Sequence, residues 1–352
     1  MKRDSSMQPL YPLKLTPIYK QMPWGGRRLS TLYGRDLPYE KTGESWDISC
    51  RPHEMGIIEN GPAAGLSLAE YIAQDKPGVL GTRLASLDRF PLLVKLIDAN
   101  DVLSVQVHPD DGFVKNGKGD PRAAATGQWH PSDTGKSEMW YILAPPACGH
   151  LIIGLKPGIT AAALRAALEN GTVESCLNHL PVAAGDIINI PPGLVHALTP
   201  GAMVAEVQQN SDITYRLYDY NRVGLDGSPR QLHIEEALAV IDFEGKIPKA
   251  TATGPAIKKG GCAMTYTIAN KRFAVVKYEL RGKYAEASDL AAFSIFTCVE
   301  GEVEIIAAKA PATHLATGSS VFIPAGMGSY TLRPKNVHCI LLKSFVPDIE
   351  KE

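Results

Sequence analysis

Four polar side chains occur where extended strands would aim them at one point. Gln106 and His108 lie in the alternating run Ser104–Val105–Gln106–Val107–His108. Alternate residues of a strand face the same side. Glu138 and His196 follow in two later strand-like segments. Two imidazoles, one carboxylate and one amide oxygen form a reasonable shell for Zn²⁺. A further coordination position left for water or substrate is typical of a catalytic metal site.

Each of these residues also has a simpler interpretation. A single histidine on a strand, such as His108, is more often a hydrogen-bonded core or surface residue than a ligand. Glu138 alone would be a solvated or salt-bridged carboxylate. His196 gains weight because it closes a repeated motif described below. The prediction of a metal site therefore depends on the residues jointly.

Cations accompany these candidate ligands. Lys95 interrupts the apolar run Pro91–Ile97, so its ammonium must either extend to water or meet an anion. Lys136 shares a strand face with Glu138, and Arg216 lies in the polar run Gln208–Tyr220. That run is either a solvated edge strand or the lining of a cavity. Three cations on one pocket favour an anionic ligand.

Short apolar runs separated by Gly and Pro would position these side chains. Several alternate with period two, which favours a β-sandwich or barrel over a doubly wound sheet. Three segments predict helices. Residues 67–71 have Ser67 as N-cap and Glu70 three positions later, residues 160–170 are rich in alanine, and residues 233–240 form the third.

A repeat divides the chain. Gly185–His196 has the pattern G-x5-P-x-G-x2-H, and Gly318–Ser329 has the same spacing with Ser329 in place of the histidine. The motif resembles one found in cupins, which are small double-sheet jelly rolls. We therefore expect a mainly β protein with two cupin jelly rolls. Residues 245–255 form a linker between a catalytic cupin domain with zinc and small helical elements (1–245) and a cupin-like domain without metal ligands (255–352).

The charge balance, the apolar runs and the cysteine spacing indicate which partners and which cellular location to expect. The chain of 352 residues has 36 basic and 37 acidic residues, which gives a net charge of −1. This balance excludes a general basic surface for nucleic acid. No apolar run is long enough to span a bilayer, and the start resembles no signal peptide. The six cysteines are at least 28 residues apart and form no CxxC pair. We expect a cytoplasmic protein with reduced thiols and no nucleic-acid or membrane partner.

Five motifs occur together in one order: Leu93–Ala99, Leu103–Pro109, Gly135–Tyr141, Pro192–His196 and Gln209–Tyr220. With them the chain resembles type I mannose-6-phosphate isomerases (phosphomannose isomerases) of the short bacterial form. The segments Pro23–Gly26 and Gly43–Trp46 are similar to the N-terminal segments of that family. The resemblance is strong over about residues 11–245 and weaker beyond. It implies a zinc-dependent aldose–ketose isomerase that interconverts mannose 6-phosphate and fructose 6-phosphate through a cis-enediol.

The resemblance also implies residue roles. Gln106, His108, Glu138 and His196 match the zinc ligands of the family, with one Zn²⁺ per chain. Lys95, Ser104 and Lys136 match the positions that hold the substrate phosphate or the adjacent sugar, and Lys136 is also a catalytic candidate. Arg216 matches the arginine beside the enediol. Glu206 matches an active-site acid and is the first candidate for the base, with a zinc-bound hydroxide as the second.

Other features and interpretations stay open at this point. The segment Gly112–Thr134 is longer and richer in Gly, Pro and Ala than the short form predicts. Cupin metal sites support many reactions, so another metal-dependent sugar isomerase or epimerase, an oxygenase, or a non-catalytic sugar-binding cupin is an alternative. The partner expected is a phosphosugar, and the chain is expected to be a monomer or a weak homodimer.

Overall fold

The computed structural model describes residues 9–118, 134–251, 254–308 and 310–348. Most of the long segment 112–134 noted in the sequence lies outside the described residues. The chain divides into two compact units. Unit 1 comprises residues 1–18, 47–94 and 253–352, and unit 2 comprises residues 19–46 and 95–252. The sequence predicts one break, near residues 245–255, whereas the compact units are interleaved along the chain.

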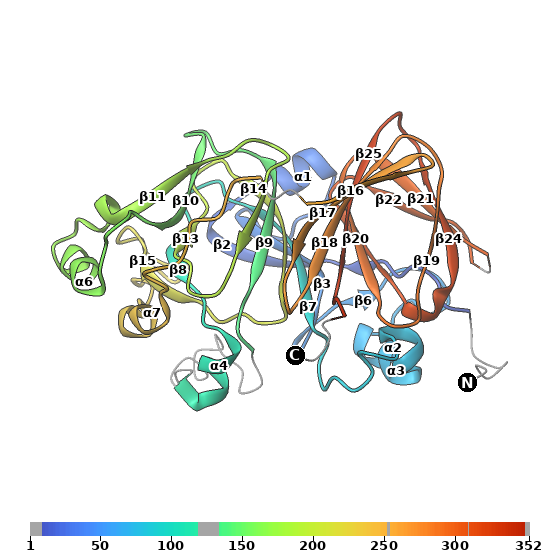
Figure 1. Ribbon diagram of the computed structural model, residues 1–352, viewed down its shortest axis with the longest axis horizontal. Helices are drawn as coiled ribbons and strands as arrows, with labels where there is room; N and C mark the ends of the chain where they lie inside the picture. The colour runs from blue at the N-terminus through green and yellow to red at the C-terminus, as the bar shows by residue number, and fades with distance from the viewer. Residues whose placement is uncertain (1–8, 119–133, 252–253, 309, 349–352) are drawn as a thin grey trace. The chain divides into compact units, whose positions relative to one another are not determined.

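Unit 2 contains two sheets, whose strands run from blue (β2, β3) through cyan and green to yellow in Figure 1. The six-stranded sheet has the order β12-β9-β14-β7-β3-β2, with bounds Ile187–Ile190, Glu138–Ala144, Met203–Gln209, Leu92–Asp98, Thr42–Ile48 and Ile18–Gly26. The five-stranded sheet has the order β11-β10-β13-β8-β15, with bounds Leu177–Pro181, His150–Leu155, His196–Ala197, Val105–Val107 and Tyr215–Tyr218. The ends of β3 and β7 at Asp47–Ile48 and Leu92–Val94 are counted with unit 1.

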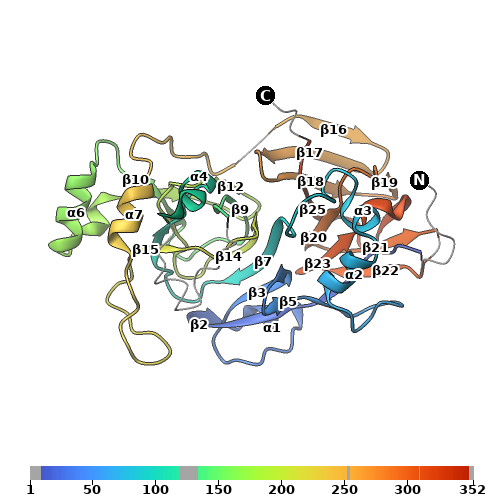
Figure 2. The same cartoon turned by 90° about the horizontal axis from the view of Figure 1, so that it is seen from below.

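Alternation along β10 shows where the core of unit 2 lies. Leu151 and Ile153 pack in a cluster with Trp140, Ile188 and other residues of the facing sheet. Ile152, between them, packs in a second cluster with residues of α6 (Ala161–Glu169) and α7 (Ile234–Val240). Figure 2 shows these two helices beside β10 and β15. The five-stranded sheet is therefore buried on both faces, with the barrel interior on one and helices on the other.

Unit 1 contains the second pair of sheets. The six-stranded sheet has the order β16-β17-β18-β25-β20-β23, with bounds Ala256–Lys259, Cys262–Ala269, Ala274–Leu280, Cys339–Phe345, Ser294–Glu300 and Ser319–Ile323. The four-stranded sheet has the order β19-β24-β21-β22, with bounds Tyr284–Ala287, Ser329–Pro334, Glu302–Ala307 and Thr313–Ala316. One apolar cluster joins side chains from both sheets, so the core lies between them. The prediction of a mainly β protein with cupin jelly rolls is confirmed.

The two jelly rolls have the same strand order. Strands β7 to β14 occupy the same places in unit 2 as β18 to β25 in unit 1. The first copy of the repeated motif forms strand β12 and the turn that leads into β13. The second copy forms strand β23 and the turn that leads into β24. His196 is buried, whereas Ser329 at the equivalent position is exposed. The sequence repeat therefore marks a structural duplication.

The predicted helices form at the expected places. Ser67 caps α2 (Leu68–Gln74) and forms a capping box with Glu70. Thr160 caps α6, and α7 follows His233. The other helical elements of the described residues are α1 (Arg28–Tyr33), α3 (Lys76–Leu80), α4 (Asp111–Phe113), η1 (Val114–Lys118), η2 (Val173–Cys176) and η3 (Ala325–Met327). Two short strand pairs complete the fold: β1 (Leu15–Thr16) with β6 (Ile57–Ile58), and β4 (Cys50–Arg51) with β5 (Glu54–Met55).

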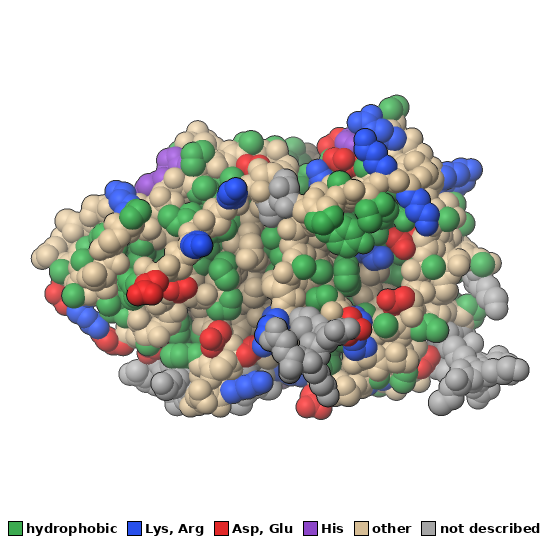
Figure 3. Space-filling model, in the orientation of Figure 1, with side chains coloured by type: hydrophobic (Ala, Val, Ile, Leu, Met, Phe, Trp, Pro, Cys, Tyr) green, Lys and Arg blue, Asp and Glu red, His purple; other side chains and the backbone are tan. Residues whose placement is uncertain are grey.

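The surface agrees with the composition. Figure 3 shows Lys and Arg side chains interspersed with Asp and Glu side chains on the face it presents. Among the described residues, no helix has the length and apolarity that crossing a bilayer requires.

Candidate active site

Strand alternation aims the candidate residues into the barrel of unit 2. Val105 and Val107 of β8 pack on the helical side of the five-stranded sheet. Gln106, between them, must therefore face the barrel interior. His196 lies directly opposite Gln106 on the adjacent strand β13, and Arg216 lies opposite Gln106 on β15. The predicted sharing of one face thus brings residues from three neighbouring strands to the same region.

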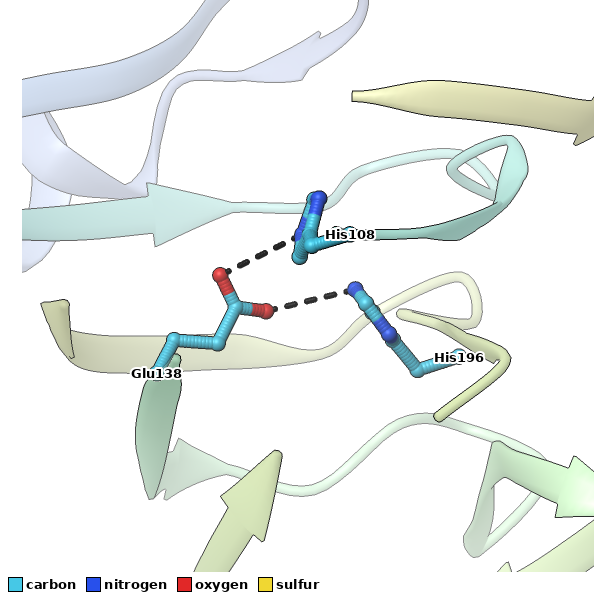
Figure 4. A group of neighbouring side chains, drawn as sticks. All are labelled: His108, Glu138 and His196. Atoms are coloured by element: carbon cyan, nitrogen blue, oxygen red, sulfur yellow. Dashed lines mark ion pairs between the residues drawn. The ribbon is translucent and has the colours of Figure 1, made fainter. Parts of the chain in front are cut away.

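Three of the predicted ligands meet in a buried group, which Figure 4 shows. The Glu138 carboxylate lies between two imidazoles, 3.5 Å from His108 Nε2 and 3.2 Å from His196 Nε2. One potential ligand atom from each residue lies within 4.8 Å of the others. None of the three residues is more than 1% exposed. Two nitrogens and a carboxylate at this spacing form a candidate metal site.

The hydrogen bonding of His196 fits a metal ligand. Its Nδ1 lies 2.8 Å from the backbone oxygen of Leu194, so Nδ1 donates the proton and Nε2 keeps its lone pair. Nε2 is buried and faces the Glu138 carboxylate, as a metal held between the two groups would require. A backbone acceptor that fixes the ring in this way is the usual support of a metal-binding histidine.

Lys136 sets the charge of this group. Its Nζ lies 2.8 Å from Glu138 Oε2 and 3.1 Å from His108 Nε2. Burial alone would raise the pKa of Glu138, but Lys136 and the imidazoles outweigh it and hold that pKa well below its ordinary value. Burial, reinforced by Lys136, lowers the pKa of His108 to about 3. The group therefore has an ionised carboxylate and a neutral imidazole, the protonation states that metal binding requires.

Lys95 meets anions rather than water. Its side chain is 3% exposed, and its Nζ lies 3.3 Å from Glu44, 3.6 Å from Glu206 and 4.0 Å from Asp212. The Trp46 ring lies beneath it, 4.7 Å from the ammonium. Burial lowers the pKa of Lys95, but the carboxylates, led by Glu44, reverse the shift and raise it. The nearest anions are thus carboxylates of the protein itself.

Glu206 is a buried acid with a shifted pKa. Trp140 Nε1 donates a hydrogen bond of 2.7 Å to its Oε2. Burial and the charge of Glu138 raise the pKa of Glu206 to about 7, although Lys136, Lys95 and Trp140 act in the opposite direction. A carboxyl group with a pKa near neutrality can exchange a proton at working pH.

A cavity of about 280 Å³ joins these groups. Its polar lining comprises Gln106, Ser104, Thr214, the cations Lys95, Lys136, Arg216 and Arg230, and the acids Glu44, Glu206 and Asp212. Arg216 donates a hydrogen bond of 2.6 Å to the backbone oxygen of Gln231. The cavity thus has a near-neutral acid and several cations in its lining, and two lining residues adjoin the candidate metal group: Lys136 contacts Glu138, and Gln106 lies opposite His196.

Comparison with known proteins decides the family. The family model "Phosphomannose isomerase type I, catalytic domain" matches residues 12–148, and the model "Mannose-6-phosphate isomerase, cupin domain" matches residues 263–343. GmuF of Bacillus subtilis, named a probable mannose-6-phosphate isomerase, is 35% identical over 326 residues, which is 92% of this chain and 96% of GmuF. The chain belongs to the type I mannose-6-phosphate isomerase family. It is therefore an aldose–ketose isomerase.

Further relatives agree with this assignment. The mannose-6-phosphate isomerase of Streptococcus mutans is 35% identical over 271 residues, 77% of this chain and 79% of that protein. The crystal structure of the mannose 6-phosphate isomerase from Bacillus subtilis superposes with a TM-score of 0.83 at 30% identity, over 96% of this chain and 99% of that one. Membership of this isomerase family, predicted from five ordered motifs, is confirmed.

Several residues that line the cavity were not predicted from the sequence. Glu44 lies in the Gly43–Trp46 segment, which had been matched to the family without a role. Asp212 and Thr214 lie in the polar run before Arg216, where only Arg216 was selected. Arg230 follows that run on a loop and had no recognised signal. Glu44, Asp212 and Thr214 could have been found from the sequence, because they are polar residues within strand-like segments. Arg230 could be recognised only once the fold showed that it lines the cavity.

Proposed function

We propose that this isomerase interconverts mannose 6-phosphate and fructose 6-phosphate through a cis-enediol, with one zinc ion held by Gln106, His108, Glu138 and His196. The main support is the buried group of His108, Glu138 and His196 in the barrel whose cavity is lined by four cations. Family membership supports the substrate pair, because the relatives are named for mannose 6-phosphate.

The proposed reaction moves a proton between C1 and C2 of the open-chain sugar. A zinc ion at this site would supply Lewis acidity toward the oxygens at C1 and C2. Glu206, with a pKa of about 7, takes the proton from one carbon and returns it to the other. Arg216 lies beside Gln106 in register and stabilises the negative charge that grows on the enediolate oxygen.

The remaining predicted residues position the substrate. Lys136 holds Glu138 ionised and presents its ammonium to the cavity, where it contacts the sugar oxygens next to the metal group. Lys95 and Ser104 line the same cavity and are proposed to lie toward the phosphate end. A phosphate dianion buried without cations would be very costly, so these groups matter chiefly for binding.

The test is a coupled assay of fructose 6-phosphate formation from mannose 6-phosphate before and after chelation. We expect chelation to abolish activity and added zinc to restore it, with about one zinc per chain in the active protein. Glu138→Gln should lose both metal and activity. Glu302→Gln is the matched control, because Glu302 also contacts a histidine but lies on β21 in unit 1.

Two results would contradict the proposal. A zinc-loaded protein that does not isomerise mannose 6-phosphate would exclude the reaction. Full activity in metal-free protein would exclude the role of zinc. The cytoplasmic location and the monomeric or weakly dimeric state stay predictions from the sequence.

A further inference from the structure

Three arginines of unit 2 surround a single buried carboxylate. Asp219, 4% exposed, lies 2.5 Å from Arg222 and 3.3 Å from Arg230. Arg216 is close enough to Asp219 and Arg230 for both charges to act on it. Asp219 is therefore shared by Arg222 and Arg230, although Arg222 also lies 4.0 Å from Asp101. This cluster of Arg216, Arg222, Arg230 and Asp219 is called the arginine cluster below.

Two of its members face the cavity. Arg216 and Arg230 line it, whereas Arg222 is directed elsewhere and donates to the backbone oxygen of Val102. Arg216 is 6% exposed, and its Nε is buried with no hydrogen-bond partner among the described residues. Burial and the charge of Arg230 lower the pKa of Arg216 to about 10. Arg216 thus has a buried donor that no described residue uses.

The lysines of the cavity differ from the arginines in this respect. Lys95 already faces three carboxylates, and Lys136 lies against Glu138. Their charges are matched by the protein. Among the described residues, Arg216 forms no ion pair, and Arg230 pairs with Asp219, which it shares with Arg222. These two cations of the cavity are therefore the least neutralised at close range.

Strand register places Asp219, and Arg230 with it, farther from His108 along β8 than Arg216. Arg216 lies opposite Gln106, and Tyr218 lies opposite Val105, so β15 runs back along β8 from the His108 end. Asp219 follows Tyr218, and Arg222 reaches Val102. Each residue advances a strand by about 3.3 Å, so Arg230, held by Asp219, lies several residues' length from His108 along β8.

We propose that Arg230 binds the phosphomonoester end of the sugar and makes the site specific for phosphorylated substrates. This inference rests on the proposed function and extends it to a residue outside the predicted set. A guanidinium fork matches phosphate oxygens geometrically and stays charged at all working pH values. Arg230 is already held by Asp219, so little side-chain freedom is lost on binding.

The test compares Arg230→Ala, Arg230→Lys and the control Arg165→Ala, which removes the same charge from an exposed pair with Glu235. Inorganic phosphate is the probe, measured as a competitive inhibitor and by calorimetric titration. We expect Arg230→Ala to raise the KM for mannose 6-phosphate and the dissociation constant of phosphate by about 10- to 100-fold, the worth of one charged hydrogen bond, with kcat changed little. Arg230→Lys should be intermediate, and Arg165→Ala unchanged.

The outcomes separate this inference from the proposed function. Unchanged phosphate binding in a folded Arg230→Ala variant overturns the inference, as does a loss confined to stability or kcat, which would indicate only a scaffold for Asp219. If the wild type fails to isomerise mannose 6-phosphate but binds phosphate in an Arg230-dependent way, the proposed reaction fails and the phosphomonoester site is supported.

Discussion

At the scale of single residues, Lys95 is the most constrained cation of the site. It is buried, its ammonium lies over the Trp46 ring, and Glu44 and Glu206 lie within 3.6 Å of it. Removing one partner of a buried ion pair is costly because the other charge stays buried without compensation. Lys95 therefore stabilises the barrel as well as lining the cavity.

We predict that Lys95→Met lowers the free energy of unfolding by about 3–5 kcal/mol at pH 8, where the facing carboxylates are ionised. Urea denaturation measures this change. Adding Glu44→Gln to Lys95→Met should recover part of the loss, because it removes one unpaired charge. A loss below about 1 kcal/mol for Lys95→Met would show that Lys95 contributes little to folding.

Glu206 gives a prediction about pH. As a base it must be ionised, so kcat/KM should rise with pH through its pKa of about 7. The hydrogen bond from Trp140 lowers that pKa. Trp140→Phe removes the bond, so the acid limb of the pH–rate profile should move to higher pH. An acid limb that stays in place would exclude Glu206 as the titrating base.

Trp24→Phe is the matched control for this experiment. Trp24 belongs to the same apolar cluster and also lines the cavity. In the described structure, the indole of Trp24 makes no hydrogen bond to Glu206. Replacing it with phenylalanine should therefore leave the hydrogen bond from Trp140 intact. Its acid limb should coincide with that of the wild type even if its rate is lower.

Sequence alone located residues whose chemistry is unusual for their surroundings. His108, Glu138 and His196 meet as predicted because period-two alternation fixes side-chain direction. The predicted roles of Lys95, Ser104 and Arg216 stay proposals. Glu44, Asp212 and Arg230 were not selected because their importance comes from contacts across distant strands. No local pattern encodes the pairing of Lys95 with Glu44, 51 positions earlier in the chain.

At the scale of elements, helix prediction followed the strength of local signals. α2 and α6 have hydroxyl N-caps and were predicted. α3 was not, because Lys76–Leu80 contains Pro77 and Gly78, both poor helix formers. It forms nonetheless within the packing of unit 1, where the following residue Gly81 has a backbone amide that bonds to Pro77.

A stack of three phenylalanines joins elements that are far apart in the sequence of unit 1. Phe293, which is fully buried, lies 4.9 Å from Phe90 and 5.0 Å from Phe322 between ring centroids. Phe90 precedes β7, whereas Phe322 lies on β23. The stack therefore fastens the segment 47–94 to the second jelly roll.

We predict that Phe293→Ala lowers the free energy of unfolding by about 3–5 kcal/mol, because it leaves a cavity between two rings. Phe293→Leu should cost less, since it fills most of that volume. Chemical denaturation followed by circular dichroism measures both. Equal losses for the two variants would indicate that filling this space does not matter.

At the scale of the molecule, strand register shows how the duplicated jelly rolls differ. Ile190 pairs with Glu138, and the equivalent Ile323 pairs with Ser294. His196 pairs with Gln106, and the equivalent Ser329 pairs with Ala287. Small side chains thus occupy the second barrel where the first has candidate ligands. Lys343, opposite Phe296, occupies the position of Glu206, opposite Trp140.

The interleaved units lead to a prediction about truncation. Residues 1–18 and 47–94 belong to the compact unit that contains the C-terminal barrel. Leu13, fully buried, exchanges backbone hydrogen bonds with Phe322. A fragment of residues 1–252 should therefore lack a cooperative unfolding transition and should aggregate, unlike the full chain. A sharp thermal transition in this fragment, with isomerase activity, would show that the linear division at 245–255 describes the folding unit.

The alternation along β8 has a consequence for how this enzyme tolerates change. Val105 and Val107 pack toward the helices while Gln106, a proposed metal ligand, faces the cavity. Core residues and a proposed functional residue therefore alternate along this strand. A substitution at Val105 or Val107 affects the packing of the sheet, whereas a substitution at Gln106 affects the cavity. A single residue inserted between Val105 and Gln106 would reverse the direction of the side chains that follow, so that Gln106 would face the helices and Val107 the cavity. We therefore expect this strand to vary by substitution during evolution but not to change in length.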